Sequence, residues 1–240
     1  MFTEIHGQWR IPPTIERSLP PAVAFPDRSY QCSIWIGLDG QRRYYQSSLP
    51  QIGISQTLPG DIIGGTVPTY EAWWQWWDRK GDAAGNPMKP QPITEIAIDA
   101  GHEIMCSLIV VNAAPPAQVK LIIKNQTTGD LVGPFPGYAP ERCIPLTVSG
   151  ATAEWITERP SIWPTDKQYN FPNYGYVDFQ DCIAVQAHPD GGDSEERNLL
   201  GARLIDMRET RPGPPRTAKI SITGTPTEHS FRTTYQASSL

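Results

Sequence analysis

Apolar and polar residues alternate with a period of two in one segment of this chain after another, and this pattern limits what it can fold into. The clearest case is residues 30–38, YQCSIWIGL, which end at the turn-forming pair Asp39-Gly40. Such alternation is typical of β-strands with one buried face, because successive side chains point to opposite sides. No segment has the 3.6-residue period of a long helix. The sequence therefore predicts an all-β protein.

The remaining expected strands are separated by turns rich in Gly, Pro and Asp, which is consistent with 25 Pro and 20 Gly in 240 residues. They are residues 52–57, 70–77, 93–98, 103–111, 119–125, 130–135, 151–158, 176–186, 199–209 and 218–224. Residues 1–29 are Pro-rich, and we expect them to form an irregular N-terminal arm with at most one short strand, at residues 7–11. No domain boundary or internal repeat interrupts residues 30–240, so we expect a single domain there.

Charge and cysteine spacing exclude several classes of function. The formal net charge is -5 and no run of Lys and Arg is present, which argues against a nucleic-acid partner.

The four cysteines have no metal-binding spacing, so we expect neither a metal nor another cofactor. Cys32 and Cys106 lie in apolar strands and are expected to be buried thiols, although two disulfides remain an alternative. No apolar run is long enough for a membrane span, and no signal peptide is visible.

A carboxylate in residues 149–160, SGATAEWITERP, is the strongest candidate for chemistry. Read as a strand, this segment places Thr152, Glu154, Ile156 and Glu158 on one face. Pro160 ends the strand, because proline cannot donate to the ladder. A glutamate in such a position is more often a solvated strand residue, so the segment alone does not decide its role.

Residues 70–77, YEAWWQWW, hold four of the eight tryptophans. As a strand, one face carries Glu71, Trp73, Gln75 and Trp77, and the other face carries aromatic residues that suit a core. A face that mixes polar groups with two tryptophans is typical of a groove for an extended or ring-shaped ligand.

Four motifs occur in the order found in the glutamic peptidases, the eqolisins, and the chain resembles this family over roughly residues 30–210. The motifs are WIGLDG at 35–40, ISQT at 54–57, YEAWWQWW at 70–77 and AEWI at 153–156. The resemblance implies a concanavalin A-like sandwich of two antiparallel sheets, and it implies an endopeptidase that acts in acid on polypeptide substrates. It also implies secretion, and we expect a monomer.

The resemblance also implies the site residues. The family's catalytic glutamine and glutamate fall on Gln56 and Glu154, with the glutamate as general base and acid on water and the glutamine stabilising the oxyanion. The residues expected to line the substrate cleft or support it are Trp35, Asp39, Glu71, Trp73, Gln75 and Trp77.

The sequence also departs from the family pattern and leaves other functions open. Leu58-Pro59-Gly60 follows the glutamine motif where the family has a glycine, and Glu71 replaces an aspartate, so an inactive member is one alternative. A second is a carbohydrate- or peptide-binding module that uses Trp35, Trp73 and Trp77 as a platform. A third is a glycoside hydrolase of the β-jelly-roll type that uses Glu71 and Glu154.

Overall fold

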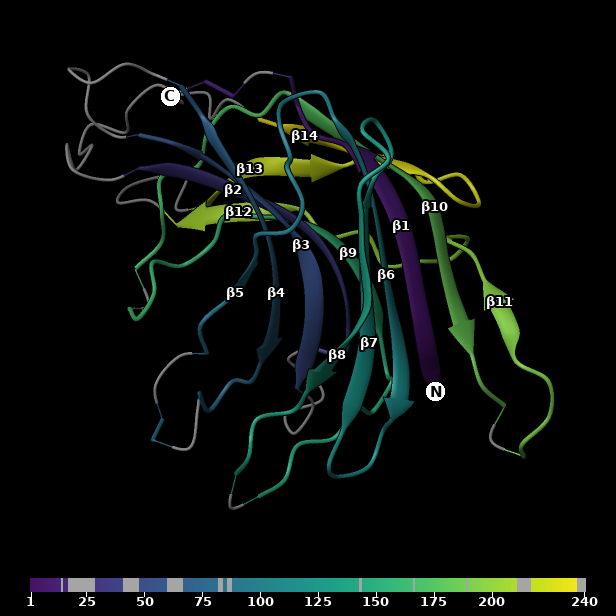
Figure 1. The fold of residues 1–240 in the computed structure, drawn as a ribbon. Helices are drawn as coiled ribbons and strands as arrows, with labels where there is room; N and C mark the ends of the chain where they lie inside the picture. Colours follow the sequence, from purple (N-terminus) through teal and green to yellow (C-terminus); the bar gives the residue numbers. More distant parts are fainter. Residues whose placement is uncertain are drawn as a thin grey trace.

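The protein is a sandwich of two antiparallel sheets, as seen in the computed structural model (Figure 1). The structure describes residues 1–13, 15–16, 29–40, 48–59, 67–81, 84–85, 88–142, 144–165, 167–188, 190–210 and 217–236. Strands form throughout this part, and none of it is helical. The all-β prediction is confirmed. The described part therefore also contains no helix that could span a bilayer.

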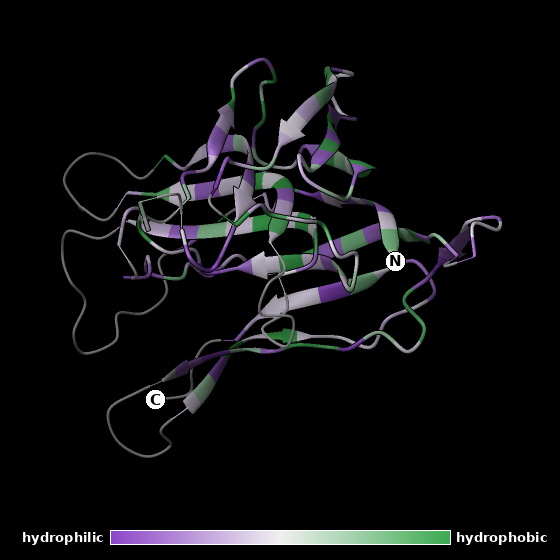
Figure 2. Cartoon of the chain, turned by 90° about the horizontal axis from the view of Figure 1, so that it is seen from below, coloured by the Kyte–Doolittle hydropathy of each residue, from purple (hydrophilic) through white to green (hydrophobic). Residues whose placement is uncertain are grey.

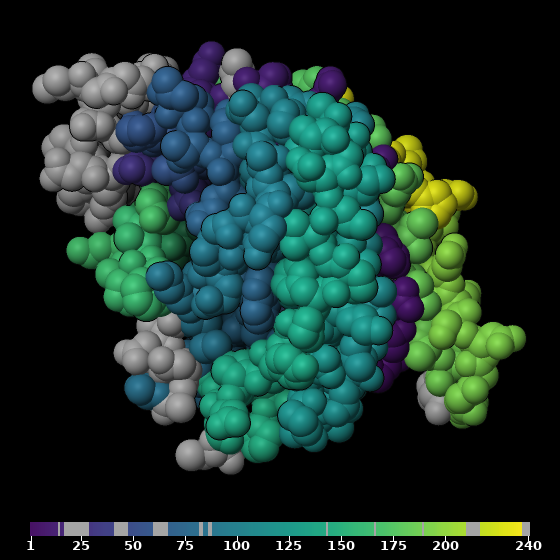
Figure 3. Space-filling model, in the orientation of Figure 1, coloured from purple at the N-terminus to yellow at the C-terminus, as the bar shows by residue number. Residues whose placement is uncertain are grey.

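The larger sheet has nine strands in the order β12-β13-β14-β10-β1-β6-β7-β8, with β11 paired to β10. Its strands are β1 (Phe2–Arg10), β6 (Glu103–Asn112), β7 (Gln118–Asn125), β8 (Leu131–Tyr138), β10 (Tyr176–Gln186), β11 (Glu195–Arg197), β12 (Met207–Thr210), β13 (Thr217–Thr223) and β14 (Phe231–Tyr235). Figure 3 shows its β6 to β8 region, in teal, covering one side of the molecule.

The smaller sheet has five strands in the order β5-β4-β3-β2-β9. Its strands are β2 (Tyr30–Leu38), β3 (Leu49–Leu58), β4 (Thr69–Trp77), β5 (Gln91–Ile93) and β9 (Ala153–Glu158). β5 and β9 are the edge strands, and the strand that carries Glu154 is therefore paired on one side, with β2.

The core lies between the sheets and is built by the alternation seen in the sequence. Along β2 the even-numbered residues, such as Ile34 and Ile36, are fully buried against inward residues of the other sheet, such as Ile5 and Ile104. Figure 2 shows the resulting bands of contrasting hydropathy along the strands. The odd-numbered residues of β2, β3 and β4 point away from the larger sheet. We call this surface, together with the even-numbered residues of β9, the outer face.

Three expectations are corrected by this architecture. Residues 1–29 are not an irregular arm throughout, because Phe2–Arg10 forms β1 between β10 and β6. Of residues 93–98, only Ile93 belongs to a strand, and the Ala97 carbonyl accepts from the Asn125 side chain instead of a ladder partner. Of residues 199–209, only the part from Met207 onward is a strand.

Candidate active site

Four residues form one row across the outer face. Gln75 pairs with Gln51, Gln51 pairs with Gly37, and Gly37 pairs with Glu154. Directly paired residues of adjacent strands share a face, and neighbouring strands are about 4.8 Å apart. Gln51 and Glu154 therefore stand about 10 Å apart at the backbone, with only a glycine paired between them. Side chains of this length can reach toward each other across the outer face and enclose a small molecule.

Two further rows extend the outer face. The second contains Trp73, Gly53, Trp35 and Ile156, and the third contains Glu71, Ser55, Ser33 and Glu158. The tryptophans of the second row donate to the third row: Trp35 Nε1 to Glu158 Oε2 at 2.8 Å and Trp73 Nε1 to Ser55 Oγ at 2.8 Å. These bonds fix the orientation of both indole rings beside the Gln51–Glu154 row.

The hydrogen bonds of Gln75 fix the orientation of the Gln51 amide. Gln75 Nε2 donates to the Met88 carbonyl at 2.6 Å, so Gln75 Oε1 must be the atom that accepts from Gln51 Nε2, also at 2.6 Å. Gln51 Oε1 is then buried without a hydrogen-bond partner among the described residues. An unsatisfied buried oxygen costs about 1–3 kcal/mol, which favours a bound water or another donor at this point.

Gln56 lies on the opposite face from Glu154, which corrects the expectation that both point into one groove. It pairs with Cys32 and Tyr70, and it lies five positions after Gln51 in a regular strand, so the two glutamines point to opposite sides. Gln56 is 0% exposed, inside the sandwich, and neither amide atom has a hydrogen-bond partner in the described structure. From this position it cannot contact a substrate held on the outer face.

Glu154 is held at the N-terminal end of β9 by contacts on both sides of the strand. On the outer face, Thr152 Oγ1 donates to Glu154 Oε1 at 3.1 Å. On the inner face, Trp155 Nε1 donates to the His6 carbonyl at 2.8 Å, and its ring lies on Gly7, where an added Cβ would come within 2.7 Å. The fit of Trp155 against β1 therefore sets the position of the neighbouring Glu154.

Asp39 supports the segment that leads into β9. Its carboxylate accepts from Ser149 N at 2.6 Å, Ser149 Oγ at 2.7 Å and Ala151 N at 2.8 Å. The residue is 0% exposed and has a φ of 70°, a conformation that aspartate tolerates better than most residues. Asp39 was expected to line the cleft or to support it from behind, and as a fully buried carboxylate it positions this segment.

Glu158 is a second carboxylate on the outer face, four residues after Glu154. It is half-buried, and desolvation raises its pKa above the ordinary value, while the hydrogen bond from Trp35 acts in the opposite direction. The sequence placed Glu158 on the face of Glu154 without giving it a role. The hydrogen bond from Trp35 gives Glu158 a structural role, because it fixes the orientation of that indole ring.

The other expected cleft residues also lie on the outer face. Trp35 and Trp73 are 5% and 6% exposed and form an apolar cluster with Leu49, against which Trp77 packs. Gln75 is 8% exposed and orients Gln51, whereas Glu71 is exposed. No group of residues in the described part of the chain could hold a metal ion.

Gln51 is the functional candidate that sequence reasoning missed. It lies in the same strand as the expected Gln56, and its position opposite Gly37 depends on the register of β3 against β2. Residues 41–47 connect these strands outside the described part, and a connection of this length does not fix a register from sequence. The available signal was the parity within 49–58, where Gln51 shares a face with Ser55 and Gln56 does not.

Three comparisons bear on this arrangement. A model of the Peptidase A4 family matches residues 1–229. No curated protein matches the chain. Among solved structures, scytalido-glutamic peptidase with a transition state analog inhibitor is similar with a TM-score of 0.68 and 18% identity, covering 98% of this chain and 93% of that one. SCP-B, an eqolisin in complex with the tripeptide Ala-Ile-His, is similar with a TM-score of 0.65 and 18% identity, covering 98% and 92%.

Proposed function

The chain belongs to the peptidase A4 family, and from that premise we propose that it is an acid-acting endopeptidase whose dyad is Gln51 and Glu154. The substrate is a polypeptide, and no metal or cofactor takes part. The proposal keeps the glutamate expected from the sequence and replaces Gln56 by Gln51.

In the proposed reaction, a water molecule lies on the outer face between the side chains of Gln51 and Glu154. Ionised Glu154 removes a proton from this water as its oxygen attacks the peptide carbonyl carbon. The carbon becomes tetrahedral and its oxygen gains negative charge. Protonated Glu154 then gives the proton to the leaving nitrogen, the C–N bond breaks, and Glu154 returns to its ionised form. One carboxylate therefore serves as base and then as acid.

Gln51 has two functions in this scheme. Its Oε1 accepts a hydrogen bond from the water, and the Nε2 proton that is not donated to Gln75 is available to the developing oxyanion. Removal of one such donor lowers kcat by about 10²–10³-fold in other enzymes. Because Gln75 fixes the amide orientation, these two functions do not require the amide to rotate during the reaction.

One observation carries the proposal: Gln51 Oε1 is a buried oxygen with no partner in the described structure, in the same row as Glu154. Buried polar atoms are normally satisfied, and an exception indicates an unseen water or a catalytic role. The side chain of Gln51 is 5% exposed, so only a small group can reach it. A water molecule or a carbonyl oxygen meets that requirement.

The test is cleavage of a denatured protein substrate from acid to neutral pH by four chains, with pepstatin present. We expect the unmodified chain to cut in acid, and we expect Glu154→Gln and Gln51→Ala to lose at least about 100-fold in kcat/KM. Gln56→Met is the matched control and should retain activity. If Gln56→Met is inactive while folded and Gln51→Ala is active, the dyad is misassigned. A folded, unmodified chain that cuts nothing would refute the enzyme proposal.

Geometry argues against the two other candidate functions. Trp35 and Trp73 are nearly buried and present little ring surface to a saccharide. Glu71 and Glu154 lie three strand spacings apart, about 14 Å, and also in different rows. The carboxylates of glycoside hydrolases are about 5–9.5 Å apart.

A further inference from the structure

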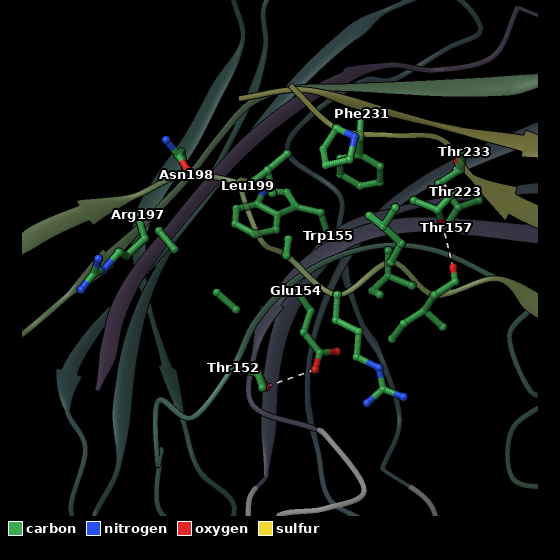
Figure 4. A pocket seen from close by; sticks show the side chains of 18 of the residues that line it. Thr152, Glu154, Trp155, Thr157, Arg197, Asn198, Leu199, Thr223, Phe231 and Thr233 are labelled. Atoms are coloured by element: carbon green, nitrogen blue, oxygen red, sulfur yellow. Dashed lines mark hydrogen bonds between the residues drawn. The ribbon is translucent and has the colours of Figure 1, made fainter. Parts of the chain in front are cut away.

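A cavity of about 710 Å³ lies beside β9 and adjoins the proposed catalytic site (Figure 4). All residues from 151 to 158 line it, including Glu154. Its other walls come from the larger sheet, where Phe231 and Thr233 of β14 contribute, and from residues 199–205. We call residues 199–205 the wall segment. The volume is within the range of about 300–1,000 Å³ typical of ligand sites.

The wall segment occupies the position beside an edge strand without pairing to it. β9 pairs with β2, and no ladder between β9 and the wall segment occurs in the described structure. The segment is instead held at its ends: Leu199 N donates to the Glu228 carbonyl at 2.7 Å, and Thr223 Oγ1 donates to the Ile205 carbonyl at 2.7 Å. Between these two attachments the wall segment leaves room beside β9.

The wall segment also exposes large aliphatic side chains. Leu200, Leu204 and Ile205 are 61%, 44% and 49% exposed, and all three line the cavity. Trp155, Ile156 and Phe231 add apolar surface to the other walls. Apolar surface that is concentrated in one cavity and left accessible is typical of a binding site.

We propose that this cavity is the subsite for a large apolar side chain, such as Leu, Met or Phe, of the polypeptide being cut. The inference rests on the proposed function and adds substrate preference to it. Glu154 and Trp35 belong both to the outer face and to the cavity lining, so the two spaces are continuous. A chain whose scissile bond lies at Glu154 therefore has neighbouring residues within reach of the cavity.

The walls are mixed in charge, because Glu154 and Glu158 line the cavity together with Arg197 and Arg203. Electrostatics therefore selects neither an acidic nor a basic side chain. Any charged group would lose hydration against Trp155 and Phe231. A large apolar side chain gains from burial, and the gain for a Leu or Phe corresponds to about tenfold or more in affinity.

The first experiment maps the cleavage sites in a denatured protein substrate for three chains: unmodified, Leu204→Asp, and Leu131→Asp as control. Leu131 is 56% exposed on β8 and does not line the cavity, so it matches Leu204 in exposure and in the charge introduced. We expect one substrate position to be enriched in Leu, Met and Phe. Leu204→Asp should reduce this enrichment about tenfold, and Leu131→Asp should leave it unchanged. The same enrichment in all three chains would overturn the inference.

The second experiment separates this inference from the proposed function. The Glu154→Gln chain is titrated with Gly/Ser peptides that carry a single Leu, or Ser in its place, and tryptophan fluorescence reports binding. We expect the Leu peptide to bind at least about tenfold more tightly. If the unmodified chain cuts nothing but this preference holds and is lost in Leu204→Asp, the peptidase proposal fails and the subsite remains. Equal affinities for the two peptides would overturn the subsite whether or not the chain is a peptidase.

Discussion

Gln51 and Glu154 lie in one row of the outer face, separated by Gly37. An ideal Cβ on Gly37 would come within 2.8 Å of Leu49 Cδ1, 3.0 Å of the Pro50 carbonyl and 3.1 Å of Gln51 Cβ. Leu49 therefore packs over Gly37, and the glycine permits the close approach of β2 and β3 that sets the position of Gln51.

We predict that Gly37→Ala lowers kcat/KM by about tenfold to 100-fold, because displacement of catalytic groups by about 1 Å has effects of that size. Overpacking should also cost about 1–3 kcal/mol in the free energy of unfolding. Steady-state kinetics and urea denaturation measure the two effects. Gly192→Ala is the control, since its Cβ would meet its nearest atom at 3.8 Å. Equal kinetics for the two variants would contradict a role for Gly37 in the site.

Asp39 gives a prediction about stability. Asp39→Ala removes the acceptor of three hydrogen bonds from Ser149 and Ala151 and leaves a non-glycine residue at positive φ. We expect the free energy of unfolding to fall by about 3 kcal/mol, measured by urea denaturation. Activity should fall as well, because the segment that leads to Glu154 loses its support. A loss below about 0.5 kcal/mol would show that this network is not important for stability.

The sequence predicted the strands best where alternation is long and bounded by turn residues. Residues 30–38 and 176–186 match β2 and β10 at both ends. β14 was not predicted, and residues 93–98 were overextended, because short segments are decided by pairing partners that the sequence does not display.

The candidate site was predicted only in part, because some of its features depend on a single strand and others on contacts between strands. Parity within β9 placed Glu154 and Glu158 on one face, and that required only the local strand. Parity within β3 could have favoured Gln51, because Gln56 shares its face with the buried Ile52 and Ile54. The position of Gln51 opposite Gly37 required the register between strands, which depends on the connection and on packing. A supporting role for Asp39 was expected, but its partners lie more than a hundred positions away and could not be identified from the sequence.

Glu158 gives a prediction about pH dependence. Burial raises its pKa in the folded state, so the folded protein favours the neutral form. Its contribution to stability is then fully present below its ordinary pKa and is lost as the pH rises through the raised pKa. Glu158→Gln keeps an acceptor for Trp35 without the charge. We expect this variant to be more stable than the unmodified chain at neutral pH and to lose that advantage in acid.

Thermal unfolding of Glu158→Gln at several pH values tests this, with Glu95→Gln as the control because Glu95 is exposed. The control should follow the unmodified chain across the pH range. An advantage of Glu158→Gln that grows in acid would have the wrong sign and would contradict the burial argument.

Gln56 gives the last prediction, because it is a fully buried amide with no hydrogen-bond partner among the described residues. Methionine has a similar shape and no strong polar group, so Gln56→Met should remove the cost of the unsatisfied amide. We expect the free energy of unfolding to rise by about 1–2 kcal/mol in urea denaturation. Gln51→Met is the matched comparison on the outer face, and it should abolish cleavage because it removes the proposed oxyanion donor. Destabilisation by Gln56→Met would mean that an ordered water or another group satisfies Gln56, and its place in the core would then need a different explanation.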